Sequence, residues 1–270
     1  MVVSTTDVPP YIWLNGAGLR DIPTAGISRR TAETIRVKQS LVSLTLEMVT
    51  ERRSSVNLIA ESPGSGGRVI ELGAHLDSVP QGPGINDNAV SAAVLLEQAI
   101  SSAQSDHEKT HRYMFWSAEE FAFAGSRSYL RNVDNPERVS AYINLEMLAA
   151  PNSGYFYARN DGSVQSRIIE DAIIEGYSQR GIQPARDTNE IPRSDDSSYQ
   201  EAGIPTGGIW GGSFEMKTPE QAEIWGGSAN EPFDSCYHRA CDTAERIDPQ
   251  KADHALNVVN HVLLTMDDVP

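Results

Sequence analysis

The 270-residue sequence has no apolar run approaching the roughly 18 residues that a membrane-spanning helix requires, so we expect no membrane partner. Basic residues are also scarce: 22 lysines and arginines stand against 37 aspartates and glutamates, which gives a formal net charge of −15. A phosphate backbone would be repelled by this charge, so we expect no nucleic-acid partner. Internal repeats and low-complexity linkers are absent as well, which favours one folded domain over a string of modules.

Only two cysteines occur, Cys236 and Cys241, and residues 1–7 contain no recognisable signal peptide. A disulfide between the cysteines would close a small loop, contribute about 2 kcal/mol on a chain-entropy estimate, and indicate an oxidising compartment. Two free buried thiols are the alternative that the spacing leaves open. The sequence also lacks a Gly-x-Ser-x-Gly motif, so a serine hydrolase of that type is excluded.

Strand-like and helix-like segments alternate along most of the chain. The expected strands are residues 56–60, 69–74, 111–117, 140–147, 155–158 and 204–210, and the expected helices are residues 28–49, 89–102, 121–130, 164–177, 218–225 and 249–266. This alternation predicts an α/β protein with a mixed, mostly parallel central β-sheet flanked by helices on both faces. We expect a single domain over residues 1–270, in which residues 1–54 form an irregular lead-in with a helix and residues 55–270 form the core.

Residues 68–91 carry the strongest local signal. An apolar run ends at His75 and Asp77, and a loop rich in glycine and proline then leads to Asp87 and an apolar helix pattern. Open α/β sheets have their sites at the carboxyl ends of the strands, and a histidine with nearby carboxylates suits a zinc ligand and its orienting partner. Taken alone, the segment fits a hydrogen-bonded loop at a strand end equally well.

Polar side chains follow the later strands in the same way. These side chains are Glu119, Glu120, Glu146, Asp195 and His238. If the strands are mostly parallel, these positions converge at one edge of the sheet together with those of residues 68–91. The residues that converge there are carboxylates and imidazoles, which are the ligands of zinc.

The charges of such a site can be balanced. With His75 and His238 neutral, the carboxylates of Asp87, Glu120 and Glu146 contribute three negative charges. Two divalent cations and one bound hydroxide would bring the total to zero. This balance predicts a two-metal hydrolase, in which the metals lower the pKa of a bridging water so that it attacks near neutral pH.

The adjacent Glu119 and Glu120 need a bend in the chain. Neighbouring side chains of a regular strand point to opposite faces, so both carboxylates reach one site only where the strand turns into the next helix. At such a bend Glu120 could bind metal, while Glu119 stays free as the general base that takes a proton from water and returns it to the leaving amine. The alternative for the pair is a solvated helix start.

Six segments then occur in a fixed order. They are Gly-Ala-His-Leu-Asp-Ser (73–78), Gly-Ile-Asn-Asp-Asn (84–88), Trp-Ser-Ala-Glu-Glu-Phe-Ala-Phe-Ala-Gly-Ser (116–126), Tyr-Ile-Asn-Leu-Glu-Met (142–147), Ala-Gly-Ile-Pro-Thr-Gly-Gly (202–208) and Phe-Asp-Ser-Cys-Tyr-His-Arg-Ala-Cys-Asp (233–242). Together they resemble the M28 family of zinc aminopeptidases, and within it the secreted bacterial leucine aminopeptidases of the Streptomyces type. The resemblance spans about residues 55–262 and implies the zinc exopeptidase fold, two zinc ions per chain and peptide substrates with a free N-terminus.

The resemblance also implies a metal ligand set. Its members are His75, Asp87, Glu120, Glu146 and His238. In this set Asp87 bridges the two ions and precedes a cis peptide bond. By the same resemblance Glu119 is the general base, Asp77 orients His75, and the phenol of Tyr237 stabilises the oxyanion. Arg193 is then a substrate-binding residue.

A disulfide between Cys236 and Cys241 is likewise implied, and with it a secreted or extracytoplasmic location. We expect a monomer that prefers large apolar N-terminal residues, for which Trp210, Trp225 and Phe214 are candidate pocket walls; ordinary packing is the alternative for these aromatic residues.

Two residues depart from the family pattern. Glu146 stands where aspartate is most frequent, and its extra methylene could change metal spacing; Asp196 stands where histidine is usual. Two other functions are compatible with the fold: a one-zinc enzyme like glutaminyl cyclase, and a non-catalytic interaction domain. The presence of a competent side chain at all five ligand positions argues against both.

Overall fold

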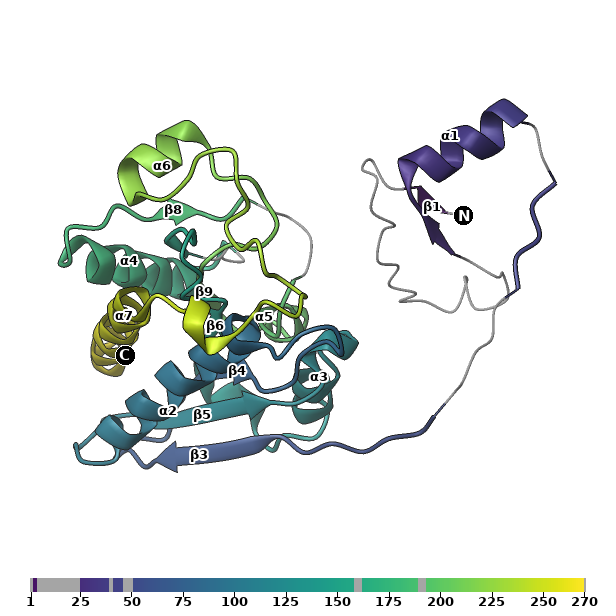
Figure 1. Cartoon of the computed structure of the whole chain (residues 1–270). Coiled ribbons are helices and arrows are strands. Elements are labelled where there is room, and N and C mark those ends of the chain that lie inside the picture. Colours follow the sequence, from purple (N-terminus) through teal and green to yellow (C-terminus); the bar gives the residue numbers. More distant parts are fainter. Residues whose placement is uncertain are drawn as a thin grey trace. The chain divides into compact units, whose positions relative to one another are not determined.

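The computed structural model describes residues 2–3, 25–38, 41–45, 51–157, 162–188 and 193–269, and the chain divides into two compact units, Met1–Ser54 and Ser55–Pro270 (Figure 1). In the first unit, strands β1 (Val2–Val3) and β2 (Gly26–Ile27) pair in parallel. The division coincides with the predicted start of the core, whereas the assignment of both parts to one domain stays a prediction.

Helix α1 (Arg29–Lys38) of the first unit is shorter than expected. The prediction of a helix over residues 28–49 is wrong for residues 41–45, which are not helical, and residues 39–40 and 46–49 lie outside the described residues. No residue of α1 is buried. The apolar periodicity of the sequence continues beyond the end of α1 and therefore predicts a longer helix. A short helix is only marginally stable in water unless an apolar face packs against the protein, and α1 has no such buried face.

The second unit contains a seven-stranded sheet in the order β3-β5-β4-β6-β9-β7-β8. The strands are β3 (Leu58–Ser62), β4 (Val69–His75), β5 (Thr110–Trp116), β6 (Val139–Glu146), β7 (Phe156–Tyr157), β8 (Ala185–Arg186) and β9 (Thr206–Trp210). Only the pairs β3–β5 and β7–β9 are antiparallel. The predicted mixed, mostly parallel sheet is therefore confirmed.

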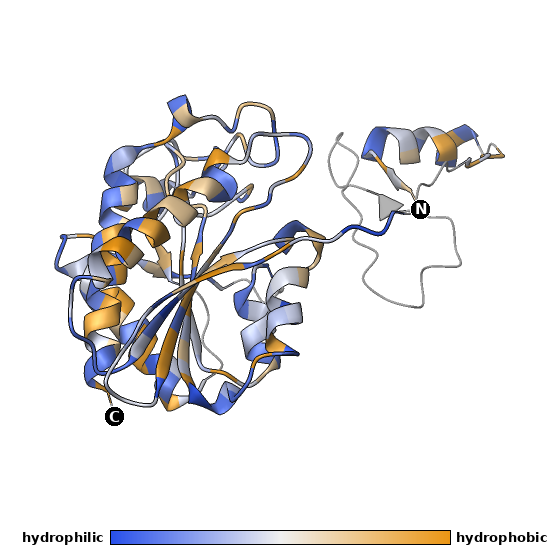
Figure 2. Ribbon diagram, turned by 90° about the horizontal axis from the view of Figure 1, so that it is seen from below, coloured by the Kyte–Doolittle hydropathy of each residue, from blue (hydrophilic) through white to orange (hydrophobic). Residues whose placement is uncertain are grey.

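Helices cover both faces of this sheet, as predicted (Figure 2). The elements are η2 (Ile85–Ala89), α2 (Val90–Ser102), η3 (Glu119–Phe121), α3 (Ala124–Leu130), η4 (Pro136–Arg138), α4 (Val164–Ser178), α5 (Asp196–Glu201), α6 (Pro219–Trp225), η5 (Ala244–Arg246) and α7 (Pro249–Asp268). Helices α2, α4 and α7 pack together on one face, and α3 and α5 pack together on the other. None of the described helices has the length and apolar character needed to cross a membrane.

Strands β4 and β6 form the buried centre of the sheet. Every residue of both strands is buried, as expected for parallel strands covered by helices on both faces. On one face, Ile70, Leu72 and Ile143 join the main core with residues of α2, α4 and α7. Because β4, β5, β6 and β9 are parallel, their carboxyl ends lie at the same edge of the sheet.

The other face of the central strands holds a buried carboxylate, Glu71. Its side chain is fully buried and accepts hydrogen bonds of 2.6 Å from Arg112 Nη1, Tyr129 Oη and Tyr199 Oη. Tyr129 belongs to α3 and Tyr199 to α5. A buried carboxylate is tolerated when it is paired and hydrogen-bonded in this way, and here it fastens both helices to the sheet.

Candidate metal centre

His75 is the last residue of β4 and begins the site. Its Nδ1 is 2.8 Å from the backbone carbonyl oxygen of Asp77, and with Nδ1 as the donor this bond leaves the Nε2 lone pair free for a metal. Nε2 lies 3.2 Å from Asp87 Oδ1 and 3.3 Å from Glu146 Oε1. The imidazole therefore faces two carboxylates from different parts of the chain.

Asp77 links this strand end to the turn after β5. Its carboxylate accepts hydrogen bonds from the backbone N–H of Glu119 at 2.9 Å and of Glu120 at 3.2 Å. Asp77 Oδ1 is 3.8 Å from His75 Nδ1. The shorter contact of Asp77 with the histidine is thus made by its backbone carbonyl, while its carboxylate holds the two glutamates.

Glu119 and Glu120 lie in the short helix η3, directly after β5, where Ala118 has a left-handed backbone conformation with φ 55°. The expected bend is confirmed. Glu119 Oε2 is 4.0 Å from His75 Nε2, and Glu120 Oε1 is 3.0 Å from His238 Nε2. Both carboxylates therefore reach the site from adjacent positions in the sequence.

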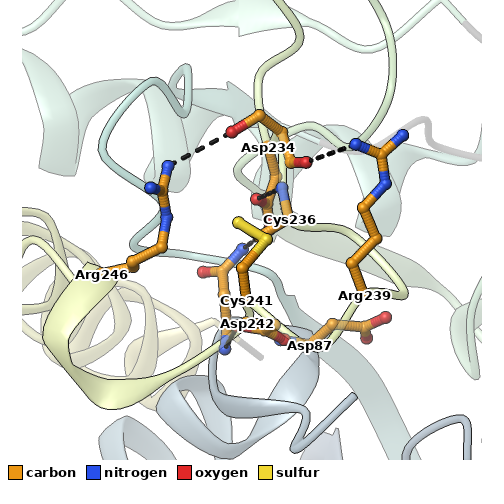
Figure 3. Close-up of a disulfide and its surroundings, with 9 residues drawn as sticks. Asp87, Asp234, Cys236, Arg239, Cys241, Asp242 and Arg246 are labelled. Carbon is orange, nitrogen blue, oxygen red and sulfur yellow. Dashed lines mark hydrogen bonds between the residues drawn. A yellow bond between two sulfur atoms is a disulfide. The ribbon is translucent and has the colours of Figure 1, made fainter. Parts of the chain in front are cut away.

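His238 lies in the loop closed by the disulfide between Cys236 and Cys241, which is present as expected (Figure 3). Its Nε2 is 3.0 Å from Asp87 Oδ2. The ring of Tyr237 stacks on the imidazole, with 3.8 Å between the ring centroids. The disulfide loop thus brings a histidine and a phenol to the carboxylates at the ends of the strands.

Asp87 lies in η2, and the peptide bond between it and Asn88 is cis, as the resemblance implied. The backbone N–H groups of Asn86 and Asp87 donate to the carboxylate of Asp242, at 2.7 and 3.2 Å. Because Asp242 follows Cys241 directly, the segment that delivers His238 also holds Asp87 (Figure 3).

The ligand atoms form two adjoining groups. One group is His75, Glu119 and Glu146, and the other is Asp87, Glu120 and His238. Asp87 joins the groups, because one of its oxygens lies beside each histidine. The structure therefore brings together all five residues predicted as metal ligands, and it places the predicted base Glu119 beside them.

The electrostatics of this cluster call for cations. Burial lowers the pKa of both histidines, but nearby carboxylates outweigh it and raise the pKa of His75 well above its usual value and that of His238 to about 9. Burial raises the pKa of Asp87, but the two histidines outweigh it and hold that pKa at about 2. Burial also raises the pKa of Glu119 and Glu146. The carboxylates thus favour positive charge at the two histidines, and divalent ions bound there would supply that charge. Imidazole with carboxylate is a donor set that fits zinc.

Arg193, the expected substrate-binding residue, lies beside the centre and is paired with Glu215. Its guanidinium carbon is 5.3 Å from the ring centroid of Trp210 and 5.6 Å from that of Phe214. Trp225, in contrast, donates its indole N–H to a backbone carbonyl and packs edge-on against Phe156. Of the three candidate aromatic residues, Trp210 and Phe214 therefore flank Arg193, whereas Trp225 serves packing.

Several residues that contact the predicted ligands are not identified as site residues by the sequence. Asp195 was expected at this edge and is fully buried at the start of α5, where burial raises its pKa to about 7. Ser194, Asn144 and Asp242 hydrogen-bond to the site residues or to one another. One signal was available for Asn144, because it precedes Glu146 by two residues and so lies on the same face of the strand.

Buried imidazoles and carboxylates in two adjoining groups, at the carboxyl edge of a mostly parallel sheet, place the chain in the class of metal-dependent hydrolases. More specifically, the chain belongs to peptidase family M28, whose model matches residues 57–263. The family resemblance seen in the sequence is thereby confirmed.

Two curated relatives and one solved structure are similar to the chain. It is 38% identical over 243 residues to the probable lipoprotein aminopeptidase LpqL of Mycobacterium tuberculosis, covering 84% of this chain and 48% of the relative. It is 36% identical over 215 residues to leupeptin-inactivating enzyme 1 of Streptomyces exfoliatus, covering 78% and 48%. A zinc aminopeptidase from Bacillus subtilis shares the fold, with a TM-score of 0.68 and 22% identity over 89% of this chain and 56% of that one. The chain thus spans about half the length of these curated relatives.

The disulfide loop provides a first prediction. Replacing Cys236 and Cys241 together by serine is expected to lower the free energy of unfolding by about 2 kcal/mol, because the small loop is no longer closed in the unfolded chain. Because His238 lies within the loop, zinc affinity is expected to fall as well. Urea unfolding and a zinc titration measure the two effects. An Arg239→Ala variant, which leaves the disulfide in place, is the control. If the serine variant unfolds and binds zinc as the wild type does, the disulfide neither stabilises the chain nor holds His238 at the metal centre.

Proposed function

We propose that this chain is the catalytic unit of a two-zinc aminopeptidase that hydrolyses the N-terminal bond of peptides. One observation carries the proposal: the carboxylate of Asp87 contacts both histidines, His75 at 3.2 Å and His238 at 3.0 Å, so two ligand groups share one bridging residue. Glu146 completes the group of His75, and Glu120 completes that of His238.

The residues around these ligands fit the roles of a peptidase. Bound zinc ions would supply Lewis acidity and a water of lowered pKa. Glu119 would accept the proton of that water and return it to the leaving amine; burial raises the pKa of Glu119 and so moves it towards neutral pH, where proton exchange is efficient. Burial, together with Asp87 and Glu120, raises the pKa of Tyr237, so its phenol stays protonated and can donate to an oxyanion.

A preference for large apolar N-terminal side chains is supported by the walls near the centre. A cavity of about 550 Å³ has one apolar wall, formed by Phe156, Trp210, Met216 and Phe233, while Arg193 with its partner carboxylate and several other polar residues line the rest. Its volume lies in the usual range of small-molecule sites. Arg193 and Trp210 also line a smaller cavity that Glu146 borders, which connects this wall to the ligand residues. The free ammonium group of the substrate would be held by the carboxylates of the centre, Glu119 included.

We further propose that the chain acts outside the cytoplasm, as a monomer, on peptides with a free N-terminus. The disulfide supports export, because disulfides persist in oxidising compartments. The similarity to a relative named as a lipoprotein aminopeptidase supports it as well.

A scan of aminoacyl chromogenic substrates, with and without added zinc, tests this function. We expect leucyl and phenylalanyl substrates to be cleaved about 10-fold or more faster than the glycyl substrate, since each buried methylene contributes to the transition state. An N-acetylated leucyl substrate is the control and should not be cleaved, because its ammonium group is blocked. Equal cleavage of blocked and free substrates would contradict an aminopeptidase.

Metal analysis of the purified protein separates this proposal from the two alternatives. The proposal requires two zinc ions per chain. One zinc ion together with cyclisation of N-terminal glutamine would identify a relative of the glutaminyl cyclases instead. A protein that binds no zinc and cleaves none of the substrates would be an interaction domain with the same fold.

A further inference from the structure

We propose that His107, His111 and Asp267 form a separate, structural metal site, which takes a divalent transition metal such as zinc and fastens α7 to the amino end of β5. Each of the three residues offers one ligand atom, and these atoms lie within 4.8 Å of one another. Strand β5 has seven residues and is about 20 Å long, so it separates His111 near its start from Glu119 and Glu120 beyond its end. The proposed site is therefore remote from the candidate metal centre and does not depend on its function.

The donor atoms of this group select the class of metal. Two imidazoles and one carboxylate suit zinc and related transition metals, whereas calcium and magnesium prefer oxygen ligands. His111 is 2% exposed, and its Nε2 lies 3.3 Å from Asp267 Oδ1. The ring of His107 lies beside that of His111, with 4.1 Å between the centroids. Because His107 and Asp267 are only partly buried, an ion can reach the group from solvent.

Ser102, the last residue of α2, orients both histidines. Its carbonyl oxygen accepts a hydrogen bond of 2.7 Å from His107 Nε2, and its hydroxyl oxygen lies 3.1 Å from His111 Nδ1. With these two nitrogens as donors, the lone pairs belong to His107 Nδ1 and His111 Nε2. A metal-binding histidine usually donates its other ring N–H to a partner of this kind, which fixes its tautomer.

The carboxylate of Asp267 is oriented by the backbone. It accepts hydrogen bonds from the N–H groups of Glu108 at 2.8 Å and Lys109 at 2.7 Å. The ammonium of Lys109 is directed elsewhere, since its Nζ donates to the carbonyl oxygens of Met266 at 2.9 Å and of Asp267 at 2.7 Å. These carbonyl groups form the negative end of α7, which favours a cation there. The lysine thus holds the helix end, and the carboxylate of Asp267 stays available to a metal.

A bound ion would join segments that are far apart in the sequence. His111 and Asp267 are 156 positions apart, and Asp267 lies in the last turn of α7. Helix α7 packs against α2 and α4 and contributes to the main core, so an ion at its end would hold this helix to the start of β5. Because the three ligands come together only in the folded chain, metal binding stabilises the fold.

A zinc titration of a chain whose candidate centre is disabled tests the inference. His75→Ala together with His238→Ala removes one histidine from each ligand group of that centre. We expect this disabled chain to bind one zinc ion, and we expect that ion, at a concentration 100-fold above its Kd, to raise Tm by about 5 °C or more. Calcium is the control ion and should leave Tm unchanged, because it prefers oxygen ligands.

Variants of the ligands locate the ion. Asp267→Asn and His107→Ala, each made in the disabled chain, should weaken zinc binding by about 100-fold or more, since loss of an orienting partner alone costs about 10–100-fold. His261→Ala is the matched control. It removes an imidazole from α7 that belongs to none of the ligand groups of the described residues, so it should leave zinc binding unchanged.

The wild-type background separates this inference from the proposed function. There, Asp267→Asn should lower the zinc content by one ion and leave cleavage of a leucyl substrate unchanged, because the substitution is remote from the candidate centre. If the wild type loses this ion on substitution but cleaves no substrate, the proposed function fails and the inference stands.

Three results would overturn the inference. One is a disabled chain that folds, as judged by circular dichroism, but binds no zinc. Another is equal zinc affinity in the disabled chain with and without Asp267→Asn, which would place the ion elsewhere. If the disabled chain does not fold, the wild-type background decides, and an unchanged zinc content of Asp267→Asn there excludes the site.

Discussion

Glu119→Gln is expected to lower kcat by about 10²–10⁴-fold, the range that general acid–base catalysis contributes. The amide has nearly the shape of the carboxylate but cannot accept a proton. Glu119 Oε2 is 4.0 Å from His75 Nε2, whereas Oε1 of Glu146 is 3.3 Å from the same atom, so loss of the Glu119 charge should leave the ligand set intact. Steady-state kinetics with a leucyl substrate and metal analysis of the same sample measure the two quantities.

Glu120→Gln is the informative companion variant. Its carboxylate lies 3.0 Å from His238 Nε2, in the other ligand group, so this substitution should reduce zinc content together with activity. The two variants together would then distinguish the roles of the adjacent glutamates, Glu119 as the base and Glu120 as a metal ligand. Near-normal kcat for Glu119→Gln would rule out its assignment as the base.

Removal of metal by a chelator is expected to abolish turnover, with recovery when zinc is returned. The five predicted ligands come from five separate parts of the chain: the end of β4, η2, η3, the end of β6 and the disulfide loop that contains His238. Metal that binds only the folded chain also stabilises it, by about 2.7 kcal/mol at a concentration 100-fold above Kd. Thermal unfolding with and without zinc measures this effect, and magnesium serves as the control ion. Full activity in excess chelator would exclude a metal-dependent mechanism.

The metal-free protein should also show a characteristic pH dependence. Burial lowers the pKa of His238, but Asp87 and Glu120 raise it from 6.5 to about 9, so the folded state binds this proton more tightly than the unfolded state. The resulting stabilisation is fully present below pH 6.5 and is lost as the pH rises towards 9. Urea unfolding across this range should therefore show a declining midpoint without zinc and a smaller decline with zinc.

Much of the site could be predicted from the sequence because strands and their carboxyl ends are local features. His75 ends β4, Glu146 ends β6, and Glu119 with Glu120 follow β5 immediately. Each apolar run marks a strand, and each polar residue at its end marks an edge position. The parallel arrangement of these strands, which alternation with helices predicts, then makes the edge positions meet.

The sequence underdetermined features that depend on contacts between distant segments. The helix expected over residues 28–49 shows this at the level of secondary structure, because apolar spacing alone could not reveal that α1 buries no residue. The partner of Arg193 is another case, because no local pattern in the sequence indicates that Glu215, 22 residues further along the chain, pairs with this arginine.

By itself, the sequence determined the class of fold, the family, the order of six strands of the central sheet and the residues that gather at its carboxyl edge; the short strand β8 was not predicted. Periodicity and motif order encode these features locally. Only the tertiary structure decided how those residues are held. The carboxylate of Asp242 accepts a hydrogen bond from the backbone N–H of Asp87, and the hydroxyl of Ser194 donates one to Glu146. Such hydrogen bonds join residues 155 and 48 positions apart. They leave no period in the sequence, because they depend on how the strands and loops pack and not on the conformation of either segment alone.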